Sequence, residues 1–391
     1  MVQVLLWMAV LLLLHTYFFY PLLLVASDRV RTFFHARVSA PAASLAPGPS
    51  ALGEWPRVSL VVAAYNEASC IAEKVHNSLA LDYPADRFQL LIGSDGSTDG
   101  TDDLVRAAQD PRVVLSRAER AGKASVLNRC IPQASGDIIV LSDANTVIDR
   151  DALKRLVSHF DDPNVGAVCG KLKLYNPRIQ DYEESAYWAY ESMIKLYEGR
   201  RGAVMGANGG LYAIRRRLFR PLSALTITDD FVIPLRIVKR GYRFTYEPNA
   251  IASEETAEDY DKEFGRRARI AAGNFQSLSF LKELLSPSQG FAAYAFWSHK
   301  VLRWCAPALM VLAFVANLFL LDSRFYQMTL GLQLTFYALA LLGRSRRLSG
   351  PFRRVTSVAY YFVVMNAAMA VGFWRYLRNT QRPAWDRTAR A

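Results

Sequence analysis

Two aspartates stand where apolar runs of the sequence end. FQLLIGS (88–94) runs directly into Asp95, and DIIVLSD (137–143) ends on Asp143. Near-continuous apolar runs of this kind are typical of buried parallel strands, and ligands bind beyond the carboxyl ends of such strands. Two carboxylate-bearing loops at one edge of a sheet suit a hard cation with oxygen ligands that holds a diphosphate. We therefore expect a metal–diphosphate site at this edge.

The loops around these aspartates are open to two interpretations. SDGSTDGT (94–101) has the residues of a tight turn, and it also has the groups of a loop that binds a base or a ribose. After the apolar run 58–65, Asn66 and Glu67 can be a helix cap and a first-turn acid, or they can bind a ligand. No G-x-G-x-x-G follows this first run, so a nucleotide would bind by a scheme other than the Rossmann fingerprint.

The elements that must position these residues alternate between strands and helices from Trp55 to about Ser286. Helical segments are expected to begin near Glu67, Asp99 and Gly122, each after or between the apolar runs. The pattern predicts a doubly wound α/β domain in which the carboxyl ends of the strands carry the site.

The composition adds membrane segments to this domain. Of 391 residues, 52% are hydrophobic and 21% are charged, which is too apolar for an ordinary soluble enzyme and too charged for a membrane bundle throughout. The apolar run 4–26 is long enough to cross a bilayer. It lacks a basic n-region and a cleavage site, so we favour a retained anchor over a signal peptide. The basic residues of 28–38 then face the cytoplasm.

The second half of the chain predicts further membrane helices. Residues 305–321, 325–343 and 355–374 are each about the length of a span. The loop 344–354 and the C-terminal tail are both basic, so three full spans would leave one basic segment outside, in conflict with the positive-inside rule. One of these segments is therefore open to a re-entrant or interfacial placement. The predicted organisation is a transmembrane helix (1–27), a cytoplasmic linker (28–55), the α/β domain (56–286), an interfacial amphipathic helix (287–304), transmembrane helices (305–374) and a basic tail (375–391).

Charge and cysteine usage exclude other classes of protein. The formal net charge is +12, but the arginines concentrate beside the apolar runs, as expected near anionic headgroups, so we expect no nucleic-acid partner. The four cysteines lie far apart without a C-x-x-C pair, which favours a reducing compartment and excludes a thiolate metal site: Cys70, Cys130, Cys169 and Cys305.

Several motifs, taken in order, resemble the GT-A domain of family-2 glycosyltransferases. In the branch with cellulose, hyaluronan and poly-N-acetylglucosamine synthases, T-E-D carries the catalytic base, and TDD (228–230) is similar to it. KRGY (239–242) supports this register, because a similar tetrapeptide ends the helix after the base in that branch. The other matching motifs are AAYNE (63–67), SDGSTDGT (94–101), GK (122–123), SDAN (142–145) and GANGG (206–210).

The resemblance implies a role for each matching residue. It implies a uracil and ribose pocket (Tyr65, Glu67, Asp95), diphosphate contacts (Lys123, Asp143), a general base (Asp230) and an acceptor site (Gly206, Ala207, Asn208, Asp229, Ile270). Without the family, Asp229 and Asp230 would be interpreted as acids in the first turn of a helix.

This sequence departs from the family's pattern at two positions. Asn145 replaces the second Asp of D-x-D, so Mg²⁺ or Mn²⁺ would be held by Asp143 and a weaker amide ligand. Arg267 and Arg269 match the arginine of Q-x-x-R-W beside the pyrophosphate, or else form a basic helix face at the membrane. Ile270 stands where that motif has the Trp that stacks on the acceptor sugar.

The aromatic segment 181–199 is interpreted mainly as core packing. The alternative is that Tyr187, Trp188 or Tyr190 stacks on acceptor sugars or lies at the membrane.

These features predict an inverting membrane glycosyltransferase that moves a hexose-type sugar from a UDP-sugar to a membrane-associated acceptor. The acceptor would be lipid-linked or a polysaccharide, in surface polysaccharide or glycolipid synthesis, with a bilayer as the other partner. We expect a bacterial inner or cell membrane, with the catalytic domain cytoplasmic. Addition of one or few sugars is favoured over processive synthesis with export, because the Trp is missing and spans are few. A non-catalytic membrane scaffold is the other alternative.

Overall fold

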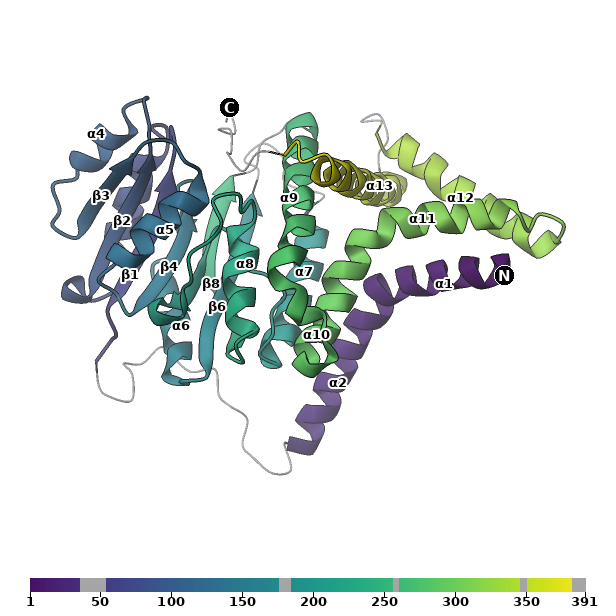
Figure 1. Cartoon of the computed structure of the whole chain (residues 1–391), viewed down its shortest axis with the longest axis horizontal. Coiled ribbons are helices and arrows are strands. Elements are labelled where there is room, and N and C mark those ends of the chain that lie inside the picture. Colours follow the sequence, from purple (N-terminus) through teal and green to yellow (C-terminus); the bar gives the residue numbers. More distant parts are fainter. Residues whose placement is uncertain (36–53, 176–183, 256–259, 345–349, 382–391) are drawn as a thin grey trace. The chain divides into compact units, whose positions relative to one another are not determined.

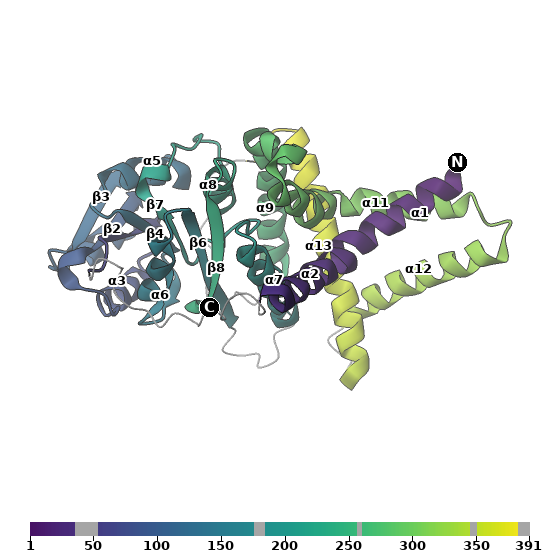
Figure 2. The ribbon, with the colours of Figure 1, turned by 90° about the horizontal axis from the view of Figure 1, so that it is seen from below.

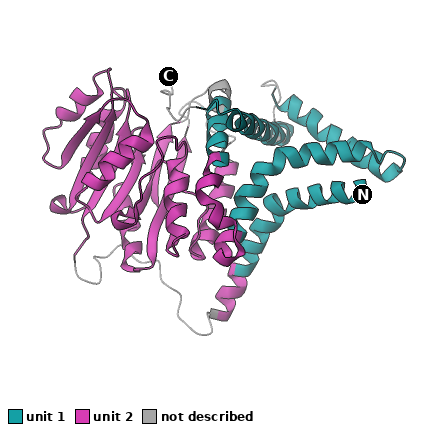
Figure 3. Cartoon of the chain, in the orientation of Figure 1, with its two compact units in different colours: residues 1–27, 259–275, 294–381 teal, residues 28–258, 276–293, 382–391 magenta. Residues whose placement is uncertain are grey.

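The computed structural model describes residues 1–35, 54–175, 184–255, 260–344 and 350–381 (Figure 1). The chain divides into two compact units (Figure 3). The helical unit comprises residues 1–27, 259–275 and 294–381, and the sheet unit comprises residues 28–258 and 276–293.

The sheet unit contains, among the described residues, one eight-stranded mixed sheet with the strand order β3-β2-β1-β4-β7-β6-β8-β5. The strands are β1 (Val58–Ala64), β2 (Phe88–Asp95), β3 (Val113–Ala118), β4 (Ile138–Asp143), β5 (Thr146–Ile148), β6 (Val165–Tyr175), β7 (Tyr212–Arg215) and β8 (Arg243–Glu255). β1 pairs in parallel with β2 and β4, and β2 pairs in parallel with β3. These pairs confirm the three predicted strands. β7 runs antiparallel to both β4 and β6, and β5 runs antiparallel to β8, so the sheet is mixed rather than wholly parallel.

Helices cover both faces of this sheet, with α3 and α6 on one face and α5 and α8 on the other (Figure 2). The helices of this domain are α3 (Ile71–Leu79), α4 (Thr101–Arg106), α5 (Lys123–Gln133), α6 (Ala152–Ser158), α7 (Glu184–Arg200) and α8 (Asp229–Val238). The main core lies between the strands and α3 and α6, where side chains such as Leu60, Ile92, Val140 and Leu153 are buried. Burial of such side chains supplies most of the favourable free energy of folding.

Close packing at Gly93 brings α5 onto β2. A Cβ atom at Gly93 would lie 2.3 Å from Val126 Cγ1 and 2.7 Å from Cys130 Sγ. Only glycine leaves room for the helix at this distance. The N-terminus of α5 is thereby fixed beside the carboxyl end of β2.

The predicted starts of two helices differ from the structure. α3 begins at Ile71 rather than near Glu67, and α4 begins at Thr101. Asn66 is therefore not a helix cap. It has a left-handed backbone (φ 54°), and its side-chain oxygen accepts a hydrogen bond from the Thr98 backbone N–H at 2.9 Å. Asn tolerates this conformation better than most residues.

Most of the helices outside the α/β domain are apolar. The described helices outside it are α1 (Val2–Leu14), α2 (Tyr20–His35), α9 (Tyr260–Leu281), α10 (Phe291–Ala295), α11 (Leu302–Leu318), α12 (Arg324–Gly343) and α13 (Gly350–Leu377). Within the described part of the chain, four continuous helices could cross a membrane by length and composition: Val2–Phe34, Phe291–Leu318, Arg324–Gly343 and Phe352–Leu377. They coincide with the four runs predicted as spans.

Two of these helices bend at π-helical turns that face one another. His15–Phe19 joins α1 to α2, and Phe296–Val301 joins α10 to α11. The Thr16 hydroxyl donates to the Ser298 carbonyl at 2.6 Å, and His15 Nε2 lies 2.9 Å from Ser298 Oγ. Backbone groups released by a π turn need partners, and these side chains supply some of them. α1 and α11 then run side by side (Figures 1 and 2).

The segment 287–304, predicted as an interfacial helix, is continuous with the helix that follows it. Phe291–Leu318 is one continuous helix, and the placement of its first part at an interface stays a prediction. Two of the polar residues of 287–304, Ser298 and His299, are buried within the helical unit. Their polarity therefore reflects contacts between helices.

Candidate functional site

The carboxyl ends of three parallel strands carry the predicted site residues. β1 lies between β2 and β4, with Ala64 opposite Ser94 and Ala63 opposite Asp143. Tyr65 to Glu67 follow β1, while Asp95 and Asp143 end their strands. The structure thus brings these residues to one rim, as the apolar runs predicted.

Asp95 is bound by the backbone of the loop that leads into α5. One carboxylate oxygen, Oδ1, accepts the Ala121 N–H at 2.7 Å, and the other, Oδ2, accepts the Gly122 N–H at 3.0 Å. Asp95 is 1% exposed. Gly122 has φ +91°, a conformation that favours glycine, and Lys123 follows as the first residue of α5. Asp95 therefore positions Lys123, and its predicted contact with a nucleotide stays a prediction.

Lys123 lies between two carboxylates at this rim. Its Nζ is 2.9 Å from Asp143 Oδ1 and 3.5 Å from Asp229 Oδ2. Burial alone would lower the pKa of Lys123, but the charges of Asp143, Asp229 and Asp230 raise it above its ordinary value. The lysine therefore stays protonated at any physiological pH. The cluster contains three aspartates and one lysine.

The two aspartates at the start of α8 have different surroundings. Asp229 is buried and faces Lys123, whereas Asp230 is partly exposed. Burial raises the pKa of Asp229, although Lys123 opposes this. Burial and the neighbouring charge of Asp229 raise the pKa of Asp230 to about 6. A carboxylate with this pKa, open to one side, can accept a proton near neutral pH.

The segment 206–209 packs directly against these acids. The Ala207 N–H donates to the backbone carbonyl of Asp230 at 3.1 Å. A Cβ atom at Gly206 would lie 2.7 Å from the Phe231 ring, and one at Gly209 would lie 2.6 Å from Asp143 Oδ2. The predicted acceptor segment thus surrounds the acidic cluster and leaves room for it.

Asn208, also predicted to bind the acceptor, uses its side chain for hydrogen bonds within the protein. Its amide nitrogen donates to the Gly170 carbonyl at 3.0 Å, and its amide oxygen accepts the Leu211 N–H at 3.2 Å. It is 7% exposed. These contacts fix the turn before β7, so the structure supports a positioning role, and direct contact with an acceptor stays a prediction.

Asn145, at the second D-x-D position, faces Glu254. Its Nδ2 donates to Glu254 Oε1 at 2.8 Å, so its nitrogen is held away and its oxygen remains as a neutral ligand. Among the described residues, no group of three or more His, Cys, Asp or Glu side chains could hold a metal ion. A divalent cation fits here only with the Asp143 carboxylate, the Asn145 amide oxygen and oxygens from the substrate. Mg²⁺ commonly binds with one or two carboxylates and substrate phosphates.

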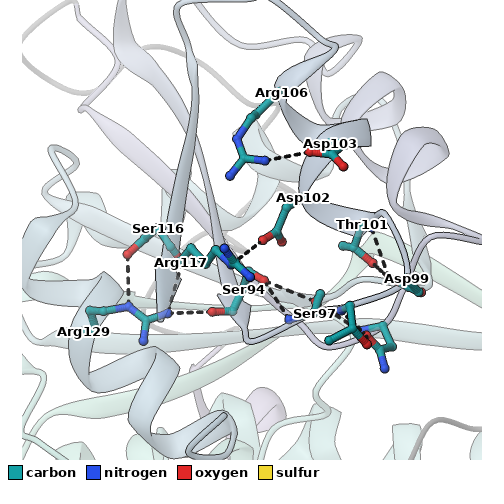
Figure 4. A network of polar contacts seen from close by, with 12 residues as sticks. Ser94, Ser97, Asp99, Thr101, Asp102, Asp103, Arg106, Ser116, Arg117 and Arg129 are labelled. Carbon is teal, nitrogen blue, oxygen red and sulfur yellow. Dashed lines mark hydrogen bonds and ion pairs between the residues drawn. The ribbon is translucent and has the colours of Figure 1, made fainter. Parts of the chain in front are cut away.

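The SDGSTDGT loop is mostly structural (Figure 4). The Asp99 carboxylate accepts hydrogen bonds from the backbone N–H groups of Ala68 and Thr101, each at 3.1 Å. The Thr101 hydroxyl accepts the Glu67 N–H at 2.9 Å, and the Ser97 hydroxyl accepts the Asn66 N–H at 3.1 Å. These bonds join the loops after β1 and β2, so the tight-turn interpretation accounts for these side chains.

Two arginines link β2, β3 and α4 beside this loop (Figure 4). Arg129 donates to the carbonyls of Ser94 and Ser116 at 3.0 and 3.1 Å, and Arg117 pairs with Asp102 at 2.9 Å.

The sequence did not identify Arg120 as a site residue. Its guanidinium lies 3.8 Å from the centre of the Tyr65 ring, and its Nη1 donates to the Tyr65 hydroxyl at 2.7 Å. A cation over an aromatic face is favourable. Glu67 accepts a hydrogen bond from Cys70 Sγ at 3.2 Å. Tyr65 and Glu67 are thus held in place, and their predicted contact with uracil or ribose stays a prediction.

The remaining predicted residues belong to other parts of the chain. Arg267, Arg269 and Ile270 lie on α9, within the portion that belongs to the helical unit. Their roles towards the diphosphate and acceptor stay predictions. Trp188 of α7 lines a small hollow in the sheet unit, together with Asn208 and with side chains of α7, β6 and β8. Tyr187 packs edge-on against Trp188.

A buried lysine on α3 was also missed. Lys74 is 2% exposed, and its Nζ donates to Ser142 Oγ at 2.7 Å and to the Thr146 carbonyl at 2.8 Å. These two residues flank Asp143 and Asn145, so Lys74 anchors the loop that carries both. Burial lowers the pKa of Lys74 to about 7, although the charge of Asp143 opposes this. A single lysine at helical spacing gave no sequence signal of such a role.

Comparison with known proteins finds a matching family and several similar proteins. Residues 56–273 match the family described as Glycosyltransferase like family 2. Poly-beta-1,6-N-acetyl-D-glucosamine synthase of Staphylococcus aureus is 30% identical over 232 residues, covering 56% of this chain and 55% of that protein. Beta-monoglucosyldiacylglycerol synthase of Synechocystis sp. is 30% identical over 244 residues, covering 59% of this chain and 50% of that protein. The chain thus matches about half the length of these relatives.

One solved structure matches nearly the whole chain. It is the mannosyltransferase PcManGT from Pyrobaculum calidifontis in complex with GDP-Man and Mn²⁺, with a TM-score of 0.67 and 25% sequence identity. The match covers 96% of this chain and 99% of that chain. The predicted fold class, an α/β domain of the GT-A type with flanking apolar helices, is confirmed.

Replacement of Lys74 by methionine should destabilise the protein, because the acceptors at Ser142 and Thr146 lose their buried donor. We expect a loss of about 1–3 kcal/mol at neutral pH. The pKa of Lys74 is lower in the folded state, so unfolding takes up a proton between about pH 7 and pH 10, and this residue makes stability rise with pH in that window.

Thermal unfolding of purified wild type and Lys74→Met at pH 7 and pH 9.5 measures both effects. The difference in Tm between the two proteins should widen as pH rises. Lys154→Met, which removes a lysine paired with Asp82 near the surface, is the matched control. A constant difference across this range would contradict the assigned role.

Proposed function

Because this chain belongs to glycosyltransferase family 2, as its motifs predicted, we propose that it moves a hexose-type sugar from a UDP-sugar to a membrane-associated acceptor, with inversion at the anomeric carbon. The observation that carries this proposal is the cluster in which Lys123 contacts Asp143 and Asp229 beside a partly exposed Asp230. One side of the cluster suits a leaving diphosphate, and the other suits an attacking hydroxyl.

Asp230 is the proposed general base. The acceptor hydroxyl oxygen attacks the anomeric carbon, its proton passes to the Asp230 carboxylate, and the bond from that carbon to the diphosphate oxygen breaks. The nucleoside diphosphate leaves with the bonding electron pair. Attack from the face opposite the leaving group inverts the anomeric carbon, and one positioned carboxylate is sufficient for this step.

Lys123 is proposed to neutralise the charge that grows on the diphosphate. Positioned cations at a developing anion are often the largest single contribution to catalysis. Its position between Asp143 and Asp229 keeps it protonated and oriented before substrate binds. Arg267 and Arg269 are proposed to contact the pyrophosphate, and Ile270 to form part of an apolar acceptor surface.

A divalent cation is proposed as the cofactor. Asp143 and the Asn145 amide oxygen would hold Mg²⁺ or Mn²⁺, and the ion would supply positive charge for the diphosphate oxygens. The three acids and one lysine leave an excess of negative charge that a divalent ion would balance. PcManGT, the similar protein of known structure, was solved with Mn²⁺.

The acceptor is proposed to be lipid-linked and to receive one or few sugars. One relative, beta-monoglucosyldiacylglycerol synthase, is named for a lipid that carries a single sugar. Ile270 also offers no aromatic face to a growing polymer. The catalytic domain is proposed to face the cytoplasm, since the basic residues after the first apolar helix favour that side. A processive synthase is the second candidate, because a polysaccharide synthase is among the relatives.

Asp230→Asn should abolish transfer while nucleotide binding is nearly unchanged, because an amide cannot accept the proton. Loss of a general base typically lowers the rate about 10²- to 10⁴-fold. Sugar transfer and calorimetric binding of the nucleoside diphosphate should be measured on the same purified protein. Asp103→Asn, which alters an exposed acid paired with Arg106, is the control and should keep full activity. Normal turnover of Asp230→Asn would refute the assignment.

A panel of nucleotide sugars should identify the donor. Release of nucleoside diphosphate would be followed with UDP-glucose, UDP-N-acetylglucosamine, UDP-galactose and GDP-mannose, each with Mg²⁺, with Mn²⁺ and with chelator. We expect one UDP-sugar to be used and chelator to stop the reaction. Use of GDP-mannose alone, the donor bound by PcManGT, would replace the UDP proposal. Full activity in chelator would contradict the metal.

A further inference from the structure

α13 crosses the other apolar helices of the helical unit steeply. In Figure 1 it is seen nearly end-on, while α1 and α11 extend across the view; in Figure 2 it runs upright while those helices extend sideways. α12 also diverges from α13 in both views. Transmembrane helices tilt on average about 20° from the bilayer normal, within about 40°. A helix that crosses three neighbours this steeply does not span the same bilayer with them.

One face of α13 is packed against its own unit. Phe362 lies edge-on to Tyr17 and Phe336, with ring centres 5.2 and 5.9 Å away. Near the other end, a Cβ atom at Gly372 would lie 2.4 Å from the Cβ of Ala271 on α9. Phe373 also packs on Phe275 of α9, with ring centres 4.8 Å apart. These contacts hold α13 along most of its length, so its crosswise direction is fixed by packing.

Large apolar side chains of α13 are exposed near both of its ends. At 3.6 residues per turn, they fall within somewhat less than half of the helix circumference. They are Phe352, Val355, Val358, Phe373, Trp374 and Leu377. Exposed apolar side chains of this size mark an interaction surface, and an aromatic residue near the end of a helix is typical of a membrane interface.

Basic residues lie beside these apolar side chains at both ends of α13. Arg353 and Arg354 lie in the first turns of α13, and Arg375 and Arg378 lie at its C-terminal end. The Arg378 guanidinium lies over the Trp374 ring, 4.5 Å from its centre. Anionic headgroups attract each such cation by about 1 kcal/mol near the surface. A spanning α13 would place one of these two basic ends on the far side, against the positive-inside rule.

We propose that α13 lies in the headgroup layer, with its exposed apolar side chains towards the acyl chains, and that only α1, α11 and α12 cross the bilayer. This inference rests on the membrane placement in the proposed function. Counted along the chain, α11 leaves the side of the α/β domain and α12 returns to it. The basic loop before α13 and the basic tail after it are then both on the side of the α/β domain, which removes the conflict between span count and charge.

The side of each connection can be measured in the full-length chain by cysteine labelling. Ser323→Cys lies between α11 and α12, Ser349→Cys between α12 and α13, and Thr388→Cys in the tail. Intact and permeabilised cells would be treated with a membrane-impermeant maleimide, with the unmodified chain as control for its own four cysteines. We expect Ser323→Cys to react in intact cells, and Ser349→Cys and Thr388→Cys to react only after permeabilisation.

The possible outcomes separate this proposal from the proposed function. Reaction of Thr388→Cys in intact cells, with Ser349→Cys protected, would show that α13 spans and would overturn the proposal. Sugar transfer would be assayed on the same variants, so a protein that is active with α13 spanning would leave the proposed function intact. Recovery of the chain in the soluble fraction would refute the membrane placement itself.

A matched pair of lysine substitutions gives a second test. Val311 is exposed at the middle of α11, and Ala367 is exposed at the middle of α13. A lysine at the centre of a span costs about 2.5–3.5 kcal/mol, whereas one at the interface extends to the headgroups. Val311→Lys should strongly reduce the amount of membrane-inserted protein, and Ala367→Lys should leave it within about twofold of wild type. Equal loss in both variants would contradict the proposal.

Discussion

Lys123 is fixed between Asp143 and Asp229, and the catalytic rim of the sheet depends on this arrangement. This arrangement requires the N-terminus of α5 to lie at a fixed position beside β2. Gly93 lets α5 pack closely on the strand, and Asp95 binds the backbone N–H groups of Ala121 and Gly122 just before the helix. A carboxylate that binds backbone N–H groups holds a loop firmly because these hydrogen bonds involve a charge. In the proposed function, the lysine would therefore need little reorganisation to bind a diphosphate, which is the condition under which a fixed charge contributes most to catalysis.

Polar residues of similar type at this rim have different surroundings, and some are bound to the backbone while others remain partly exposed. Asp99 and Asn66 are bound to loop backbone, while Asp143 and Asp230 keep part of their surface open. Between the two acids of α8, burial and contact with Lys123 assign Asp229 to charge balance. Burial and the charge of Asp229 raise the pKa of Asp230, and Asp230 remains partly exposed. A pair of adjacent acids with different surroundings can thus supply one structural anion and one base.

The sequence predicted β1, β2 and β4 well because each of these strands is buried on both faces and forms a nearly uninterrupted apolar run. The antiparallel strands β5 and β7 are only three and four residues long, so they carry no pattern of their own and depend on the strands beside them. Lys74 and Arg120 were missed for a similar reason. Their roles arise from contacts with Thr146 and Tyr65, which are distant in the sequence. Ser298 and His299 are buried against other helices, and the sequence could not show this, because amphipathic spacing is the same whether water or another helix meets the polar face.

The central claim is that Asp230 acts as a base whose pKa is raised by Asp229, and the pH dependence of kcat/KM tests it most directly. The acid limb of this profile reports the ionisation of an essential base in the free enzyme. In the wild type, activity should fall as pH falls through about 6, where Asp230 becomes protonated. In Asp229→Asn the like charge is removed, so the limb should move to lower pH. An acid limb that is absent, or that stays at the same pH in Asp229→Asn, would contradict the account.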